Sequence, residues 1–187
     1  MKIIIFRHGK VDYPPITMLS ACELVEWAHA YNTNQLDKES QPTEKAKQVA
    51  VSVNAVVCSE LPRSIESAQV LGVNEITYSN SLFNEAGLPI AGWNFPKLSV
   101  RIWAIFFRLA WLMGYSNNSE TKKDAKQRAS LAAKKLIELA ESHKSVAFIG
   151  HGIMNRFIAD ELRYLGWVGP KSPAKNYWEY GVFSVKT

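Results

Sequence analysis

Cysteine is scarce in this sequence of 187 residues, which contains only Cys22 and Cys58. The two cysteines do not form a CxxC pair, and they are too few for a disulfide framework. Cys58 ends the apolar run of residues 55–58, where it is most simply a buried strand residue. The cysteine content therefore excludes a small scaffold held together by disulfides.

A long apolar run is also missing. The most apolar stretch, residues 98–113, is interrupted by Arg101 and Arg108, and it is too short and too charged to span a bilayer. The apolar run at the N-terminus is too short for a signal peptide and reaches a charged residue at once. We therefore expect a cytoplasmic protein without a membrane partner.

Repeats, low-complexity tracts and segments poor in apolar residues are all absent. The length is sufficient for one domain with a full core but too short for two. Apolar residues make up 47% of the chain and aromatic residues 11%, as in folded globular proteins. We predict a single domain that covers residues 1–187.

Positive charge is in moderate excess, with a formal net charge of +5. This excess favours anionic ligands without identifying one. Many of the basic residues share one polar helical pattern, which is more typical of a solvated helix face than of a nucleic-acid-binding patch. They are Lys122, Lys123, Lys126, Arg128, Lys134 and Lys135. No nucleic-acid-binding motif accompanies them, so we expect no nucleic-acid partner.

Several short apolar runs have the composition of β-strands. Residues 3–6, 55–58 and 146–149 are continuously apolar, which is typical of strands buried on both faces of a parallel sheet. Residues 75–78 and 180–185 are candidates for further strands.

Helical periodicity separates these runs. Capping-box pairs are present at Ser20 with Glu23 and at Thr121 with Asp124, and Pro62 suits the first turn of a helix. Helices are expected behind these signals, over residues 46–53 and after Gly152. The alternation of strands and helices predicts an α/β fold, a three-layer α/β/α sandwich with a mainly parallel central sheet.

Charged and polar residues follow the three buried strands. Arg7 and His8 follow the first strand, Arg63 follows the second, and His151 follows the third. In open α/β sheets, ligands bind beyond the carboxyl ends of the strands. We therefore expect two arginines and two histidines at one edge of the sheet.

These residue types suit a phosphoryl group. Arginine guanidinium groups donate hydrogen bonds to phosphoryl oxygens, a neutral imidazole can attack phosphorus, and a second imidazole can hold an oxygen. Zinc is the alternative explanation for paired histidines, but a third ligand and the usual close spacing are missing, and two arginines would oppose a cation. His29 and His143 fall on polar positions and are expected to have no catalytic role.

Four motifs, taken in order, resemble the histidine phosphatase (phosphoglycerate mutase-like) superfamily over residues 1 to about 165. They are Phe6-Arg7-His8-Gly9, then Ser59-Glu60-Leu61-Pro62-Arg63 followed by Ser67-Ala68, then Leu82-Phe83-Asn84-Glu85, and Gly150-His151-Gly152. Each motif alone is weak, but all four in this order make a strong signal. The resemblance implies a phosphoglycerate mutase-like fold and a metal-independent phosphatase that needs no cofactor.

The resemblance also implies roles for individual residues. His8 would be the phosphorylated nucleophile, and Glu85 would protonate the leaving alcohol and help to activate water. The phosphoryl oxygens would be bound by Arg7, Gly9, Arg63 and His151. Glu60 and Glu120 are alternatives to Glu85 as the acid.

Departures from the common pattern bear on the reaction. Lys10 and Val11 stand where the mutases carry a glutamate and a small hydroxyl residue, and Ser67 replaces a threonine. The mutases also have more chain between the second arginine and the second histidine. These differences argue against a glycolytic mutase. A phosphomutase of another kind, or a binding protein with little turnover, stays as an alternative.

Residues 91–115 form the most distinctive segment because they are rich in tryptophan and phenylalanine. We expect a helical cover, either as packing or as a wall of the substrate pocket formed by Trp103 and Trp111. Lys10 is either a solvated loop residue or a contact for a second anionic group. The expected partner is a phosphorylated small molecule, with a phosphoprotein as the alternative. The oligomeric state is left open.

Overall fold

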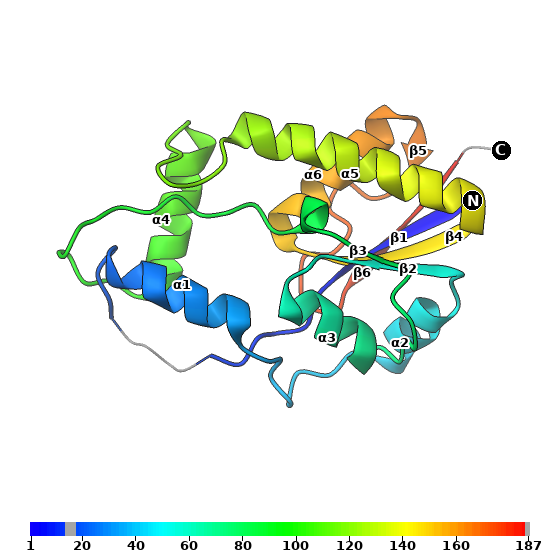
Figure 1. Cartoon of the computed structure of the whole chain (residues 1–187), viewed down its shortest axis with the longest axis horizontal. Coiled ribbons are helices and arrows are strands. Elements are labelled where there is room, and N and C mark those ends of the chain that lie inside the picture. The colour runs from blue at the N-terminus through cyan, green and yellow to red at the C-terminus, as the bar shows by residue number, and fades with distance from the viewer. Residues whose placement is uncertain (14–17, 186–187) are drawn as a thin grey trace.

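The computed structural model describes residues 1–13 and 18–185, and a six-stranded sheet lies at its centre (Figure 1). The strands are β1 (Lys2–Arg7), β2 (Ala55–Cys58), β3 (Tyr78–Ser79), β4 (Ser145–Gly150), β5 (Trp167–Val168) and β6 (Tyr180–Val185). Their order across the sheet is β3-β2-β4-β1-β6-β5. The first four in this order are parallel, whereas β6 and β5 are antiparallel additions at one edge.

Helices cover both faces of the sheet, so the predicted three-layer α/β/α architecture is confirmed. The helices are α1 (Glu23–Thr33), α2 (Glu44–Val51), α3 (Pro62–Val70), α4 (Val100–Leu112), α5 (Lys122–His143) and α6 (Gly152–Tyr164), with a 3₁₀ turn η1 (Ser81–Phe83). Figure 1 shows α5 and α6 on one side of the sheet and α2 and α3 on the other. None of the described helices is both long enough and apolar enough to cross a membrane.

The alternation of side chains along β1 explains the two cores. Ile3 and Ile5 are fully buried against the α5 and α6 layer, whereas Ile4 and Phe6 pack into the α2 and α3 layer. Successive side chains of a strand point to opposite faces, so a strand that is apolar at every position needs cover on both sides. This is why the continuous apolar runs are central strands.

Both predicted capping boxes are present. The Ser20 N–H donates to the Glu23 carboxylate at 2.7 Å, and the Glu23 N–H donates to the Ser20 hydroxyl at 3.2 Å. Thr121 and Asp124 make the same reciprocal pair at the start of α5. These contacts satisfy N–H groups that have no partner within the helix.

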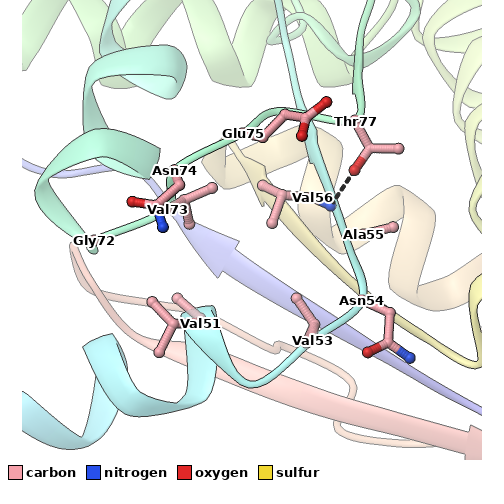
Figure 2. A pocket seen from close by; sticks show the side chains of 11 residues that line it. Val51, Val53, Asn54, Ala55, Val56, Gly72, Val73, Asn74, Glu75 and Thr77 are labelled. Carbon is pink, nitrogen blue, oxygen red and sulfur yellow. Dashed lines mark hydrogen bonds between the residues drawn. The ribbon is translucent and has the colours of Figure 1, made fainter.

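Three predicted boundaries were wrong. The strand expected at residues 75–78 is Tyr78–Ser79. The Thr77 N–H donates to the Val56 carbonyl oxygen at 2.9 Å, but the Val56 N–H donates to the Thr77 hydroxyl at 3.0 Å and not to a backbone carbonyl (Figure 2). The helix expected over 46–53 ends at Val51, because Asn54 must already meet Ser145 of β4. The cover predicted for 91–115 is helical only over α4, and residues 91–99 precede it without helical structure.

The cover lies where the parallel strands end. In Figure 1, β1 runs from the N-terminus toward the side of the molecule that carries α4. Trp103 and Phe107 of α4 pack with Leu19 and Leu24 in a separate cluster. A bridge between Leu19 and Leu98 ties the start of the cover to the segment before α1.

Candidate active site

The carboxyl ends of β1, β4 and β2 lie side by side and bring the four predicted residues together. Arg7 ends β1 and His8 follows it, while His151 directly precedes α6 and Arg63 lies in the first turn of α3. The rings of His8 and His151 have centroids 5.0 Å apart, although the residues are far apart in the chain. The parallel order β2-β4-β1 is what places these three strand ends next to one another.

His8 is buried and held in one tautomer. Its Nδ1 lies 2.7 Å from the Gly9 carbonyl oxygen, and since a carbonyl only accepts, Nδ1 carries the proton. Burial, followed by the positive charge of Arg63, lowers the pKa of His8 from 6.5 to about 3. The imidazole is therefore neutral, with an unprotonated Nε2.

Gly9 occupies a position that admits no larger residue. A Cβ atom there would lie 2.1 Å from the ring of Trp178. The Gly9 N–H donates to the Ser67 hydroxyl at 2.8 Å, and that hydroxyl donates in turn to the Arg63 carbonyl oxygen at 2.5 Å. The loop that carries His8 is thus fixed to α3, the helix that carries Arg63.

His151 is fully buried, and its two ring nitrogens have different surroundings. Nε2 lies 2.7 Å from the Ser59 hydroxyl, whereas the buried Nδ1 has no hydrogen-bond partner among the described residues. The His151 N–H donates to the Asn155 side chain at 3.0 Å, and the same side chain donates to the Phe6 carbonyl oxygen at 2.9 Å. Burial lowers the pKa of His151 well below its usual value, so this ring is also neutral.

Aromatic rings position the two arginines. Arg7 stacks on Tyr177 at 4.6 Å from the ring centroid and donates to the Lys175 carbonyl oxygen. Arg63 stacks on Tyr31 at 5.2 Å and donates to the Asn32 side chain at 2.8 Å. In both arginines the Nε atom is buried without a partner among the described residues.

Glu85 lies at the N-terminus of α6. Its carboxylate accepts from the Ile153 N–H at 3.1 Å, the Met154 N–H at 3.0 Å and the Ala86 N–H at 2.9 Å. Glu85 and Arg7 line one cavity of about 570 Å³, which extends toward Arg156. Neither alternative acid lines this cavity: Glu120 pairs with Arg128, and Glu60 is exposed.

Unsatisfied polar atoms are concentrated here. Among the described residues, four buried side-chain nitrogen or oxygen atoms lack a hydrogen-bond partner. Three of the four belong to Arg7, Arg63 and His151. Buried polar groups are nearly always satisfied in native proteins, so two free arginine Nε–H donors beside an unpartnered histidine nitrogen indicate a site for an anionic ligand.

Comparison with known proteins identifies the architecture. No protein-family model and no curated protein sequence matches the chain. Among solved structures, an alpha-ribazole phosphatase from Shigella flexneri superposes with a TM-score of 0.62 and 16% identity, over 100% of this chain and 91% of the other. The chain has the phosphoglycerate mutase-like fold.

Two further solved phosphatase structures superpose on the chain over most of its length. A mycobacterial glucosyl-3-phosphoglycerate phosphatase gives a TM-score of 0.55 at 17% identity, over 86% of this chain and 78% of the other. A variant phosphoserine phosphatase from Entamoeba histolytica, in complex with phosphoserine, gives a TM-score of 0.57 at 14% identity, over 87% of this chain and 80% of the other. At these identities, the structural similarity shows a shared fold and no more.

Three other predicted residues lie outside the cavity next to Glu85. Lys10 is half-exposed and pairs with Asp37 at 2.6 Å. Trp103 is buried against Phe107 and donates to the Leu19 carbonyl oxygen at 2.7 Å. Trp111 is buried and donates to the Glu120 carbonyl oxygen at 2.7 Å. All three have structural partners of their own, and their roles toward substrate stay predictions.

Several residues of the site were not predicted. Tyr177 has its ring centroid 5.6 Å from that of His8, and Lys175 lines the cavity beside Glu85. Both belong to an irregular segment before β6, where no sequence pattern marks a function. Asn155 had a weak signal, since it lies one helical turn after His151 and its amide can reach back to the strand ends.

Two further observations bear on alternative sites. Within residues 1–13 and 18–185, no group of three or more histidine, cysteine, aspartate or glutamate side chains is arranged to hold a metal ion. A second hollow of about 210 Å³ lies at the opposite end of β2, next to Ala55 and Gly72 (Figure 2). Its described lining contains no histidine or arginine, so it lacks the donors found around His8.

Proposed function

We propose that this chain is a phosphatase that hydrolyses phosphomonoesters through a phosphohistidine on His8, without a metal ion or another cofactor. One observation carries the proposal: Nδ1 of His8 donates to the Gly9 carbonyl oxygen, so the neutral ring has its lone pair on Nε2. A neutral, fixed imidazole is a nucleophile ready to attack phosphorus.

The surrounding donors are suited to the phosphoryl oxygens. Arg7 and Arg63 offer free Nε–H groups, and His151 offers Nδ1. When the Ser59 hydroxyl donates to Nε2 of His151, Nδ1 carries the proton and becomes a donor as well. Fixed donors of this kind stabilise the charge of the transition state without reorganisation.

Glu85 is the candidate for proton transfer. In the first step a bond forms between His8 Nε2 and phosphorus while the phosphorus–oxygen bond to the alcohol breaks, and the alcohol takes a proton from the Glu85 carboxyl group. In the second step water attacks phosphorus and gives its proton to Glu85, and the nitrogen–phosphorus bond breaks to release phosphate. The position of Glu85 on the cavity that Arg7 also lines supports this role.

The substrate that suits this cavity is a small phosphorylated molecule. Arg156 and Lys175 line it together with Arg7 and Glu85, so further negative charge on the substrate would be favoured. The three neighbours named above carry the names of phosphatases for different phosphomonoesters, which supports the reaction class without selecting a substrate. A phosphoprotein is the alternative substrate class.

The test is hydrolysis of p-nitrophenyl phosphate between about pH 5 and 8, the range in which histidines normally titrate. We expect His8→Ala to lower kcat/KM by about 10⁴-fold or more, because the nucleophile is lost. The exposed His29 provides a matched control, and His29→Ala should retain wild-type activity.

A chelator, EDTA, distinguishes a metal-independent phosphatase from a metal enzyme. Hydrolysis should persist in EDTA, and activity abolished by EDTA or retained by His8→Ala would contradict the proposal. Release of free phosphate should match release of p-nitrophenol. Transfer of the phosphoryl group to an added alcohol in place of water would indicate a phosphomutase.

A further inference from the structure

Helix α4 is apolar on two opposite faces, and the described protein covers only one of them. Trp103, Phe107 and Trp111 are fully buried. The opposite face carries large apolar side chains with exposed fractions between 41% and 55%, namely Ile102, Ile105, Phe106, Leu109 and Leu112. Helices that are apolar all round normally lie inside a protein or against lipid.

Neighbouring side chains extend this surface. Trp93 is half-exposed, and its ring centroid lies 6.1 Å from that of Phe106. Met113, directly after the helix, is 83% exposed. We call this set the α4 apolar face: Trp93, Ile102, Ile105, Phe106, Leu109, Leu112 and Met113. A contiguous exposed patch of large apolar residues marks a surface that binds a partner or a membrane.

The segment that contains this face carries charge of one sign, although Lys97 pairs with Glu23 near the start of α1 at 3.2 Å. Between Glu85 and Glu120 the chain contains no acidic residue, whereas it contains Lys97, Arg101 and Arg108. The only charged residues in the 34 residues of this segment (86–119) are therefore basic. This pattern complements an anionic surface rather than a second basic one.

The two arginines lie on one flank of α4 and line a hollow there. The hollow has a volume of about 420 Å³ and is otherwise apolar, with Leu88, Ile105 and Leu109 in its wall. Arg101 is exposed and makes no ion pair with any described residue. An apolar hollow with the unpaired guanidinium group of Arg101 at its side fits a lipid, whose acyl chain is apolar and whose phosphate is anionic.

We propose that the α4 apolar face docks on the surface of an anionic lipid bilayer. The helix would lie in the plane of the interface, with its exposed apolar side chains among the acyl chains and Arg101 among the phosphates. Amphiphilic helices with aromatic and aliphatic residues on one side and arginine or lysine beside them bind membranes in this way.

This inference differs from the expectation that the protein has no membrane partner. That expectation was based on the absence of a spanning segment, and a helix that lies in the interface does not need to span. A second copy of the chain is a less suitable occupant, because pairing two such faces would bring two basic segments together without an acidic residue in either. The docking is independent of the proposed phosphatase reaction.

Docking would place the candidate active site close to the bilayer. Arg108 donates to the carbonyl oxygens of Ala86 at 3.0 Å and Gly87 at 3.4 Å, and these residues directly follow Glu85. The helix that carries the docking face is thus hydrogen-bonded to the segment that carries the candidate acid.

Vesicle co-sedimentation tests the proposal. The full chain would be mixed with vesicles of phosphatidylcholine alone and with vesicles that also contain about 30% phosphatidylglycerol. We expect binding to the anionic vesicles to be about tenfold stronger or more, and to weaken as salt is raised to about 1 M. His8→Ala should bind vesicles like the wild type, so the test of membrane binding is independent of the test of phosphatase activity.

Variants locate the surface. The double variant Ile105→Glu with Leu109→Glu should reduce binding at least about tenfold, because two charges replace exposed apolar side chains. Leu131→Glu is the matched control, since Leu131 is an isolated exposed leucine on α5. Arg101→Glu should abolish the preference for anionic lipid, whereas Lys134→Glu, at an exposed position on α5, should retain it.

Two outcomes would overturn the proposal. One is the absence of binding to anionic vesicles, or binding that the Ile105→Glu, Leu109→Glu variant retains while its circular dichroism is unchanged. The other is a wild-type dimer in light scattering that dissociates in the same double variant and does not bind vesicles. That result would assign the face to a second copy of the chain.

Discussion

The surroundings of His8 and helix α4 differ from an ordinary protein surface and interior in opposite ways. Around the strand ends, polar side chains are buried: seven of the nine buried polar or charged residues among those described are His8, Ser59, Arg63, Ser64, Ser67, His151 and Asn155. Along α4, large apolar side chains are exposed. Each arrangement has a free-energy cost that a folded protein normally avoids.

Buried polar atoms near His8 and exposed apolar side chains on α4 each indicate a binding partner, but of different chemistry. In the first region most of the buried polar atoms have partners, so the few that lack one point to a ligand that supplies it. In the second region the helix is anchored by its inner face, so the uncovered outer face points to a surface that covers it. The first inference leads to a phosphoryl group and the second to a lipid bilayer.

Among changes that leave His8 in place, replacement of the candidate acid should have the largest effect. Glu85→Gln should lower kcat by about 10³-fold to 10⁴-fold, roughly 4–5 kcal/mol in the barrier, because the amide cannot transfer the proton. The loss should be greater for an alkyl phosphate than for p-nitrophenyl phosphate, whose leaving group needs little protonation. Glu138→Gln, in an exposed pair with Lys135, is the control. Equal losses for both substrates would remove Glu85 as the acid.

The inner face of α4 should matter for stability and not for substrate choice. Trp103→Ala should lower the free energy of unfolding by roughly 3–5 kcal/mol, because it empties a fully buried site. Trp93→Ala, on the exposed side, should cost less than roughly 1 kcal/mol. Urea unfolding measures both. If Trp103→Ala instead changed the ranking of phosphorylated substrates, the ring would be a wall of the pocket.

Replacement of Asn155 measures how much the buried polar network contributes to the free energy of unfolding. Asn155→Ala removes the acceptor of the His151 N–H and the donor to the Phe6 carbonyl oxygen. We expect a loss of roughly 3 kcal/mol in urea unfolding, because two buried backbone groups lose their partners. Asn117→Ala, whose side chain bonds at an exposed position, should be nearly neutral. Similar values for the two variants would mean that the buried network is not what fixes His151.

The smallest expected effect is the change in the free energy of unfolding with pH. The unfolded chain protonates His8 as the pH falls below about 6.5, whereas the folded chain does so only near a pKa of about 3. Between these values the unfolded state binds more protons, so stability decreases as the pH falls. For one such histidine the loss at pH 5 is roughly 2 kcal/mol.

His8→Asn removes this titration and should therefore lose less stability than the wild type between about pH 6.5 and 5. His29→Asn, at an exposed position, should follow the wild-type curve. Parallel curves for the wild type and His8→Asn would show that the folded protein does not hold His8 neutral.

The sequence predicted the polar region better than the apolar one. Arg7, His8, Arg63 and His151 could be placed because each follows a buried strand or opens the next helix, and parallel strands bring such positions to one edge. Tyr177 and Trp178 could not be placed, because they reach His8 and Gly9 from an irregular segment whose course depends on the antiparallel β6.

The outer face of α4 was missed for a different reason. Apolar residues on both sides of a helix predict burial on both sides, and only the tertiary structure shows that one side is uncovered. The ion pair of Lys10 also depends on tertiary structure, because its partner Asp37 lies far along the chain and is brought near by the loop after α1.

The most direct test of the central claim is to trap the phosphoryl group on the enzyme. Wild-type protein would be mixed with p-nitrophenyl phosphate, quenched in base during the first turnover and mapped by mass spectrometry of its peptides. The account predicts one phosphoryl group on His8, stable in base and labile in acid, that forms at least as fast as the steady-state turnover. Turnover without a phosphorylated His8, or a phosphoryl group on another residue, would contradict it.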